Sequence, residues 1–405
     1  MNKLILLLAC LGGMAMARAD ELPVHQLKSL SSDEFSDLQF LKPLLAGKRV
    51  VQLGESGHGV AEFDLVKVRL IKFLHQQLGY DVVAFESSLP QCYAADQSLA
   101  TATAADSMRA CIFPQWRMAE VLPLFDYLRV VRQSGQRLTL AGFDVQPSSA
   151  SERGGTRLRA MLGALGSPLR AGIDANEAML DLGIRNSASI AENAERLERF
   201  YGNTATALTD GAVALSSAGF AREDVAVALK SAQSRVHLTR QFASAGSNRT
   251  ASAEARDIGM AENIDFLLDT LYPGRKVIVW AHNAHIAYTR PAGMYRSMGM
   301  QLAERRKSEI YSIGLYMGRG EAANNDNSHY PVAAPPAASM ESVLARETSS
   351  YVFVDFSRAK TTPATIWMFA PIVAREWGRL PTMIVPAATF DAVLYIDTVT
   401  PPGKL

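Results

Sequence analysis

The chain contains seven short runs of β-branched, aromatic and other apolar residues. Most of these runs are continuously apolar and do not alternate between apolar and polar positions. Continuous apolar runs of this length are typical of central strands that are covered on both faces. The strands predicted on this basis are residues 49–53, 82–85, 138–143, 277–280, 310–316, 352–356 and 393–396.

Amphipathic helices are predicted between the first of these strands. Residues 61–77 carry apolar side chains mostly at helical spacing, and residues 118–133 follow the same pattern. Strands and helices therefore alternate up to residue 145, which is the rhythm of a parallel sheet with crossover helices. Residues 321–339 are polar and proline-rich, and we expect a long loop there.

Residues 150–272 contain no strand pattern. Their apolar residues form helical stripes, which are Ile190, Leu197 and Tyr201, then Val225, Leu229, Ala232 and Val236, then Met260, Ile264, Leu267 and Leu271. We interpret this region as a helical insertion between strands of the sheet. The predicted fold class is α/β, with a central, largely parallel sheet, flanking helices and an inserted helical lobe, within one domain over residues 20–405.

Composition and charge narrow the possible partners. The 405 residues are 48% hydrophobic and 20% charged, which is ordinary for a globular protein with a full core. The 41 basic and 40 acidic residues give a formal net charge of +1. Such a balance provides no overall electrostatic attraction for nucleic acid or an anionic membrane, so we expect neither as a partner.

Residues 1–19 have the features of a secretory signal peptide. Lys3 precedes an apolar run over residues 4–16, and Ala17-Arg18-Ala19 is a typical cleavage site. The apolar run is shorter than the roughly 20 residues that a membrane-spanning helix needs. We predict a periplasmic or secreted protein with no integral membrane segment after signal removal. The alternative is a lipoprotein attached at Cys10, because Leu7-Leu8-Ala9-Cys10 resembles a lipid-attachment sequence.

Two cysteines remain after the signal peptide. Cys92 and Cys111 are 19 residues apart. An even pair of cysteines in an oxidising compartment favours a disulfide, and we predict that these two are bonded. The alternative is a pair of unbonded, buried thiols.

Titratable side chains follow four of the predicted strands. They are Glu55 and His58 after the first strand, Glu86 after the second, Asp144 after the third, and His282 and His285 after the fourth. Ligands of open α/β sheets bind at the carboxyl ends of the strands. Histidines and carboxylates gathered there are suited to general acid–base catalysis. If strands 49–53 and 82–85 are neighbours, Glu86 lies beside His58. The alternatives are ordinary loop histidines and an Asp144 that only ends its strand through a turn.

Two known catalytic sequence motifs are incomplete or absent. Ser56 lies in a sequence that begins like a nucleophile elbow, but His58 stands where that motif has its second glycine. The sequence lacks H-E-x-x-H, although His282 and His285 could bind a metal together with Glu86 and His58.

Two basic residues have alternative interpretations. Arg256 either extends its guanidinium to solvent or points this cationic group into the site. Lys67 is expected on a solvated helix face.

Four motifs occur in order along the chain. They are VQLGESGHG at 51–59, followed by Lys67, then GY and VAFE within 79–86, RDIGMAEN at 256–263 and VIVWAHNAHI at 277–286. These segments resemble the motifs of the erythromycin esterase family, and the resemblance extends from about residue 40 to the C-terminus.

The resemblance implies an ester hydrolase, classically acting on a macrolide lactone, that needs no metal or other cofactor. It implies His58 as the general base that activates water, with Glu55 and Glu86 orienting the histidines. His282, His285 and Arg256 would complete the site around the substrate carbonyl. Lys67 would bind substrate in place of an Arg of the family, keeping the charge but losing the bidentate geometry. In an exported chain this activity would serve antibiotic resistance on the drug's entry path.

Two other functions stay open at this point. One is a metal-dependent hydrolase that uses the same histidines and glutamates. The other is a periplasmic binding protein for haem or a metal, with the histidines as ligands and no turnover. The substrate class expected for the preferred hydrolase is a small-molecule ester.

Overall fold

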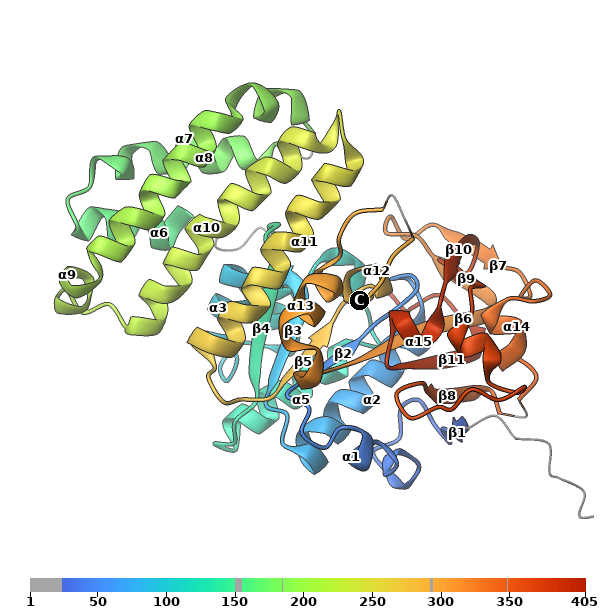
Figure 1. Cartoon of the computed structure of the whole chain (residues 1–405). Helices are drawn as coiled ribbons and strands as arrows, with labels where there is room; N and C mark the ends of the chain where they lie inside the picture. The colour runs from blue at the N-terminus through green and yellow to red at the C-terminus, as the bar shows by residue number, and fades with distance from the viewer. Residues whose placement is uncertain (1–23, 150–154, 184, 292–293, 348) are drawn as a thin grey trace, which may run out of the picture.

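The structure is a computed structural model that describes residues 24–405 apart from 150–154, 184, 292–293 and 348 (Figure 1). The predicted signal peptide at residues 1–19 and the alternative lipid-attachment site at Cys10 lie outside the described residues. Within the described ranges, no helix combines the length and the apolar character of a membrane span.

A nine-stranded sheet forms the centre of the described structure. The path β1-β8-β11-β6-β2-β5-β3-β4 orders eight of the strands, and β7 pairs with β6. The six strands from β11 to β4 along this path are parallel to one another, whereas the pairings of β1, β7 and β8 are antiparallel. The predicted α/β fold with a largely parallel sheet is therefore confirmed. The strands are β1 (Val24–Gln26), β2 (Val50–Leu53), β3 (Val82–Ser88), β4 (Thr139–Asp144), β5 (Val277–Trp280), β6 (Ile310–Ala323), β7 (His329–Val332), β8 (Tyr351–Asp355) and β11 (Ala392–Val399).

Helices cover both faces of this sheet. Val51 and Leu53 of β2 belong to a hydrophobic core with α2 (Ala61–Leu78) and α5 (Leu122–Gln133). Val50 of the same strand belongs to a second core, with α11 (Arg249–Phe266) and α13 (Met298–Arg306). Because successive residues of a strand point to opposite faces, burial on both sides requires the continuous apolar runs seen in the sequence. The shorter helices are α1 (Leu41–Leu44), α3 (Leu89–Gln97), α4 (Ala104–Cys111), α12 (Asn283–Ile286), α14 (Met340–Leu344) and α15 (Pro386–Thr389).

A helical lobe is inserted between β4 and β5, as predicted, and extends away from the sheet beyond β4 (Figure 1). It has a hydrophobic core of its own, in which Ile190, Leu197 and Tyr201 are fully buried. Helix α11 returns from this lobe to the sheet, where Met260 and Ile264 join the second core. The lobe helices are α6 (Gly155–Ala164), α7 (Ile173–Asp181), α8 (Ser187–Asp210), α9 (Ala212–Ser217) and α10 (Arg222–Ala245).

Two expectations about elements were wrong, and one small sheet was not predicted. Residues 321–339 are not one long loop, because β6 continues to Ala323 and pairs with β7 in an antiparallel hairpin. The helix expected at 118–133 begins only at Leu122, since Met118 makes a bridge with Lys404. The two-stranded sheet of β9 (Ile372–Glu376) and β10 (Leu380–Ile384) was not predicted.

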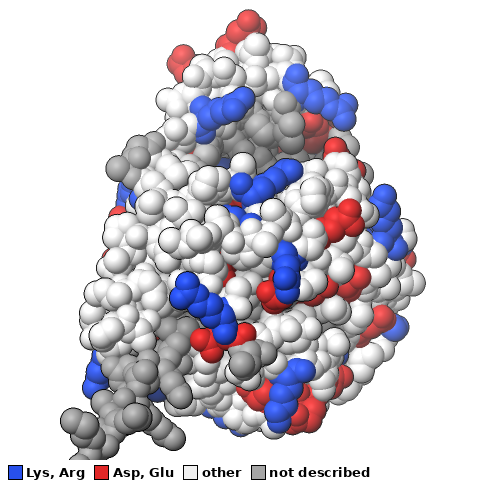
Figure 2. All heavy atoms as spheres, turned by 90° about the vertical axis from the view of Figure 1, so that its right-hand side faces the viewer, with Lys and Arg blue, Asp and Glu red and all other residues white. Residues whose placement is uncertain are grey.

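Figure 2 shows the side of the molecule on which β7, β9 and β10 lie in Figure 1. Basic and acidic side chains are interspersed there among uncharged residues. Neither sign of charge is gathered into a single patch on this face (Figure 2).

Candidate active site

The carboxyl ends of β2, β5, β3 and β4 bring the predicted site residues together. β2 and β3 are not neighbours, which the sequence left as a possibility, because β5 lies between them and pairs with both. This order inserts His282 between His58 and Glu86. The rings of His58 and His282 have centroids 5.1 Å apart, and the backbone N–H of His282 donates to Glu86 Oε2 at 3.0 Å.

Glu55 and His58 form the first part of the site, in the turn after β2. A Cβ atom on Gly54 would lie 2.1 Å from Asn283 Oδ1, so this turn requires glycine at the end of the strand. Glu55 is fully buried, and its Oε1 lies 2.5 Å from His58 Nδ1. The carboxylate therefore orients the imidazole through Nδ1 and leaves Nε2 available for proton transfer.

Two further residues hold Glu55. The indole Nε1 of Trp116 donates to Glu55 Oε1 at 2.8 Å, and the ammonium of Lys67 donates to Glu55 Oε2. Lys67 is fully buried on α2, with its Nζ 4.4 Å from the ring centroid of Trp280, so the expectation of a solvated lysine was wrong. Burial lowers the pKa of Lys67, and the charge of Glu55 opposes that shift. In this structure Lys67 contacts Glu55, and its predicted contact with substrate stays a prediction.

Glu86, Asp144 and Arg256 form a second, buried charge cluster. Arg256 of α11 donates from Nη2 to Glu86 Oε1 at 2.8 Å and from Nε to both oxygens of Asp144 at 3.2 Å. Asp144 also accepts from the backbone N–H of Gln146 at 3.1 Å, as the turn interpretation expected. Arg256 is thus directed into the site, but two carboxylates already balance its charge. Burial raises the pKa of Glu86, but the charges of His285 and Arg256 outweigh this and hold it well below the usual range.

His285 joins this cluster as a cation. Its Nδ1 lies 3.0 Å from both oxygens of Asp257, and its Nε2 lies 3.3 Å from Glu86 Oε1. Burial lowers the pKa of His285, but Asp257 and Glu86 outweigh it and raise the pKa well above its ordinary value. Asp257 did not emerge from the strand-end search because it lies within α11; its only signal was its place beside Arg256 in a motif.

His282, in contrast to His285, is neutral. Its Nδ1 accepts a hydrogen bond from the backbone N–H of Ala284 at 3.1 Å, which leaves the proton of the neutral ring on Nε2. Burial lowers the pKa of His282 well below its usual value, and the charges of His58 and His285 lower it further. A neutral His282 can donate from Nε2 to an oxygen atom bound beside His58.

Aromatic side chains enclose His58. Trp116 and Trp377 meet its ring edge to face, with centroids 5.0 and 5.3 Å away. Trp377 also stacks on His282 at 6.0 Å. Trp377 lies in the turn between β9 and β10, next to Glu376, and neither residue was predicted from the sequence. The only local signal was the Trp377-Gly378 pair, and their positive φ angles of 57° and 62° form the tight turn.

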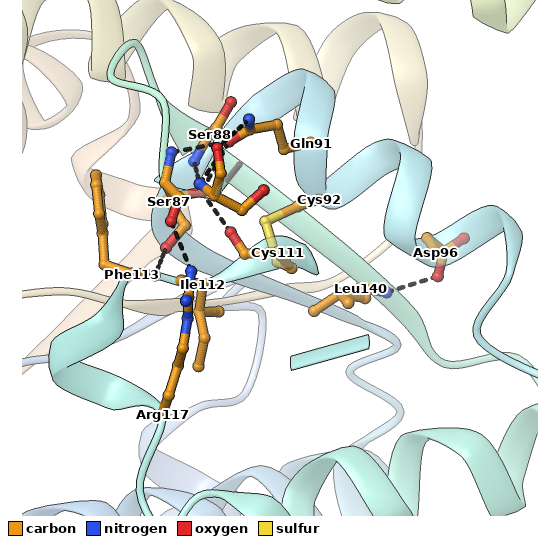
Figure 3. The surroundings of a disulfide bond; sticks show 12 residues. Ser87, Ser88, Gln91, Cys92, Asp96, Cys111, Ile112, Phe113, Arg117 and Leu140 are labelled. Atoms are coloured by element: carbon orange, nitrogen blue, oxygen red, sulfur yellow. Dashed lines mark hydrogen bonds between the residues drawn. A yellow bond between two sulfur atoms is a disulfide. The ribbon is translucent and has the colours of Figure 1, made fainter. Parts of the chain in front are cut away.

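The predicted Cys92–Cys111 disulfide is present and joins α3 to the end of α4 (Figure 3). Beside it, the backbone N–H of Phe113 donates to Ser87 Oγ at 3.2 Å, and that of Ser88 donates to Ser148 Oγ at 3.1 Å. The contact of Phe113 fixes the segment after α4 against the end of β3 (Figure 3), and Ser148 also donates from Oγ to the carbonyl oxygen of Cys111. Trp116, which donates to Glu55, lies at the end of that segment.

The other candidate chemistries find less support in the geometry. Ser56 Oγ is buried and has no hydrogen-bond partner among the described residues, so no base there activates it as a nucleophile. Within the described part of the chain, no three His, Cys, Asp or Glu side chains are arranged to hold a metal ion. Glu86 instead pairs with Arg256, and His285 pairs with Asp257.

Known proteins resemble this chain in sequence and in fold. The family described as erythromycin esterase matches residues 75–399. YbfO, a protein of Bacillus subtilis (strain 168) that is named as a hydrolase, is 30% identical over 392 residues, which are 90% of this chain and 87% of that protein. The erythromycin esterase type I of Escherichia coli is 26% identical over 127 residues, which are 30% of this chain and 29% of that protein.

A solved structure of a mutant of the erythromycin esterase EreC, in its open conformation, has a TM-score of 0.75 at 19% identity. The match covers 94% of this chain and 98% of that chain. At this identity the likeness supports the fold alone. The family match and the relative at 30% identity support a hydrolase. With its fold and most of its length matched, this chain belongs to the erythromycin esterase family.

Proposed function

We propose that the chain is an ester hydrolase in which His58 takes a proton from the attacking water. The observation that carries this proposal is the 2.5 Å contact between His58 Nδ1 and the buried carboxylate of Glu55. A carboxylate in this position selects the tautomer that accepts a proton at Nε2 and stabilises the imidazolium that forms. Lys67 and Trp116 position Glu55 for this task.

The developing oxyanion needs a hydrogen-bond donor close to His58. His282 is suited to this role, because its ring lies 5.1 Å from that of His58 and the proton of its neutral form is on Nε2. Arg256 is less suited than the sequence analysis expected, since Glu86 and Asp144 already occupy its guanidinium. We assign Arg256, Glu86 and His285 to positioning His282, whose backbone N–H donates to Glu86.

The proposed substrate is an ester of a small molecule, and a macrolide lactone is the first candidate because of the names of the relatives. Export after cleavage behind Ala19 is also part of the proposal. The Cys92–Cys111 disulfide supports it, because such bonds persist in oxidising compartments. Fractionation of cells that make the protein should place a chain beginning at Asp20 outside the cytoplasm; a full-length chain in the cytoplasm would contradict export.

The catalytic test is turnover by metal-stripped protein of a panel that contains a fourteen-membered macrolide and several simple acyl esters. His58→Ala should lower kcat by about 10²-fold or more, because it removes the general base. The matched control is His329→Ala, since His329 is an exposed histidine on β7 and should leave turnover unchanged.

Each other result of this test has a definite meaning. Full turnover in a folded His58→Ala variant would refute the mechanism. Activity that returns only when a metal is added would favour the metal-dependent hydrolase. A wild-type protein that is inactive on the whole panel with or without metal would contradict the proposed ester class.

A further inference from the structure

Two buried polar atoms face each other beside His58. They are Nε2 of His282 and Oε2 of Glu376, which lie 3.6 Å apart. Neither atom has a hydrogen-bond partner among the described residues. Buried polar atoms of folded proteins are rarely left unsatisfied, and a catalytic role is one reason for an exception. The pair therefore indicates a place where polar atoms of a ligand complete the hydrogen bonding.

The hairpin of β9 and β10 holds Glu376 in this place. Glu376 is the last residue of β9, and the backbone N–H of the next residue, Trp377, donates to the carbonyl oxygen of Ser56 at 2.5 Å. Trp377 stacks on the ring of His282 and has a φ of 57°, which is an unfavourable conformation for an aromatic residue. Strained backbone of this kind persists where surrounding contacts impose it, commonly at functional sites. The contacts here fix the hairpin directly against the His58 turn.

The charges around Glu376 favour its protonated form. Burial, together with the charge of Glu341 of α14, raises the pKa of Glu376 to about 8 against the opposing effect of Arg290. Tyr316 of β6 also faces Glu376 and stays neutral, because burial raises its pKa well above the usual value. His282 is neutral for the reasons given above. Near neutral pH, the carboxyl group and the imidazole Nε2 are therefore two neutral proton donors side by side.

We propose that Glu376 is a catalytic residue, the general acid that protonates the leaving oxygen of the ester while His282 binds the carbonyl oxygen. This proposal rests on the ester-hydrolase function proposed above and adds the residue that completes its acid–base pair. None of the four sequence motifs contains Glu376, and it comes from an element that the hydrophobic pattern did not predict.

The proposed reaction is balanced in protons and electrons. His58 takes one proton from water as the water oxygen bonds to the carbonyl carbon, and the carbonyl electron pair moves to the oxygen that His282 binds. When the carbonyl re-forms, the bond to the alcohol oxygen breaks, and that oxygen takes the proton of Glu376. The proton on His58 then returns to the Glu376 carboxylate, which leaves one carboxylic acid and one alcohol as products.

The decisive test compares two esters with the same acyl group and different leaving groups. Protonation of the leaving oxygen matters for an alkyl alcohol and hardly for 4-nitrophenol, which leaves as an anion. Glu376→Gln should lower kcat on the ethyl ester by about 10²-fold, a typical contribution of a general acid, and change the 4-nitrophenyl ester by about twofold at most. Glu321→Gln, which changes an exposed carboxylate on β6, is the matched control and should change neither rate.

The pH profile gives a second readout. In the wild type, kcat for the ethyl ester should fall as pH rises through about 8, because the acid form of Glu376 is lost. This alkaline limb should be missing for the 4-nitrophenyl ester. Equal losses on both esters in Glu376→Gln would show a structural role and overturn the proposal.

A measurement without turnover separates this proposal from the ester-hydrolase function. Carbon-13 NMR of wild-type protein labelled in its Glu carboxyl groups, assigned with Glu376→Gln, should show one carboxyl group that titrates near 8. Titration of Glu376 in the ordinary carboxylate range would overturn the proposed acid even if the enzyme hydrolyses esters. The raised titration in a protein that hydrolyses no ester would instead contradict the ester-hydrolase function.

Discussion

Glu55 shows how the site is built from single residues. One buried carboxylate accepts from Lys67 and Trp116 and contacts Nδ1 of His58. A buried carboxylate is stable only when it is paired and hydrogen-bonded, so the partners that orient it also make its burial possible. Orientation of the general base and local stability therefore depend on the same contacts.

Lys67→Met should be strongly destabilising for this reason. The change leaves Glu55 charged, buried and without its cationic partner, and breaking such a pair costs about 3 kcal/mol or more. Urea unfolding should show this loss in the free energy of unfolding. Lys72→Met on the same helix is the control, because Lys72 pairs with the exposed Asp33 and such pairs contribute about 1 kcal/mol or less. Equal losses in the two variants would contradict this account of Lys67.

The sequence could not reveal the environment of Lys67. Its helix has apolar residues at mostly helical spacing, and a lysine among them is ordinarily at the solvated edge. Burial follows instead from Glu55, which lies in a turn before the helix and is the partner of its ammonium group. A pattern of single residues does not show such pairings.

At the scale of elements, two connections position the site from outside the parallel sheet. The disulfide joins α3, which follows the Glu86 strand, to α4, which precedes Trp116. The β9–β10 hairpin contributes Glu376 and Trp377 from the C-terminal part of the chain. The paired cysteines were predictable from their number and compartment. The hairpin was not, because its short strands carry charged residues such as Arg375 and lack a continuous apolar run.

Loss of the disulfide should affect both stability and activity. Cys92→Ser with Cys111→Ser removes a cross-link that closes a loop of 19 residues, and the free energy of unfolding should fall by about 3 kcal/mol. Turnover should also fall, because the segment that carries Trp116 is less constrained. Thiol counting on denatured mature protein provides the control for the wild type and should find no free thiol. Two reactive thiols would show that the bond does not form.

At the scale of the whole molecule, the stability of the fold should depend on the charge of His285. The pKa of this histidine is raised above 6.5 in the folded state, so its pairing stabilises the fold fully below 6.5 and this contribution is lost as pH rises through the folded value. The difference in unfolding free energy between wild type and His285→Gln should therefore be larger at about pH 6 than at about pH 9. Urea unfolding at both pH values measures it.

His75→Gln is the matched control for this experiment. Burial lowers the pKa of His75, so its neutral form is favoured in the folded state and its contribution is lost as pH falls. The pH dependence of the two variants should thus have opposite signs. A His285→Gln difference that grows toward alkaline pH would contradict the cationic assignment of His285.

The sequence by itself determined the strands of the parallel sheet, the helical insertion and the cysteine pair. Strands buried on both faces and amphipathic helices each produce a characteristic spacing of apolar residues within a short segment. It also placed His58, Glu86 and His282 at strand ends. Only the tertiary structure put β5 between β2 and β3, buried Lys67 against Glu55 and brought Glu376 opposite His282. Strand order and side-chain partners depend on contacts between segments that are distant in the sequence. Charge states depend on these contacts and on the exclusion of water around them. A local sequence pattern contains neither kind of information.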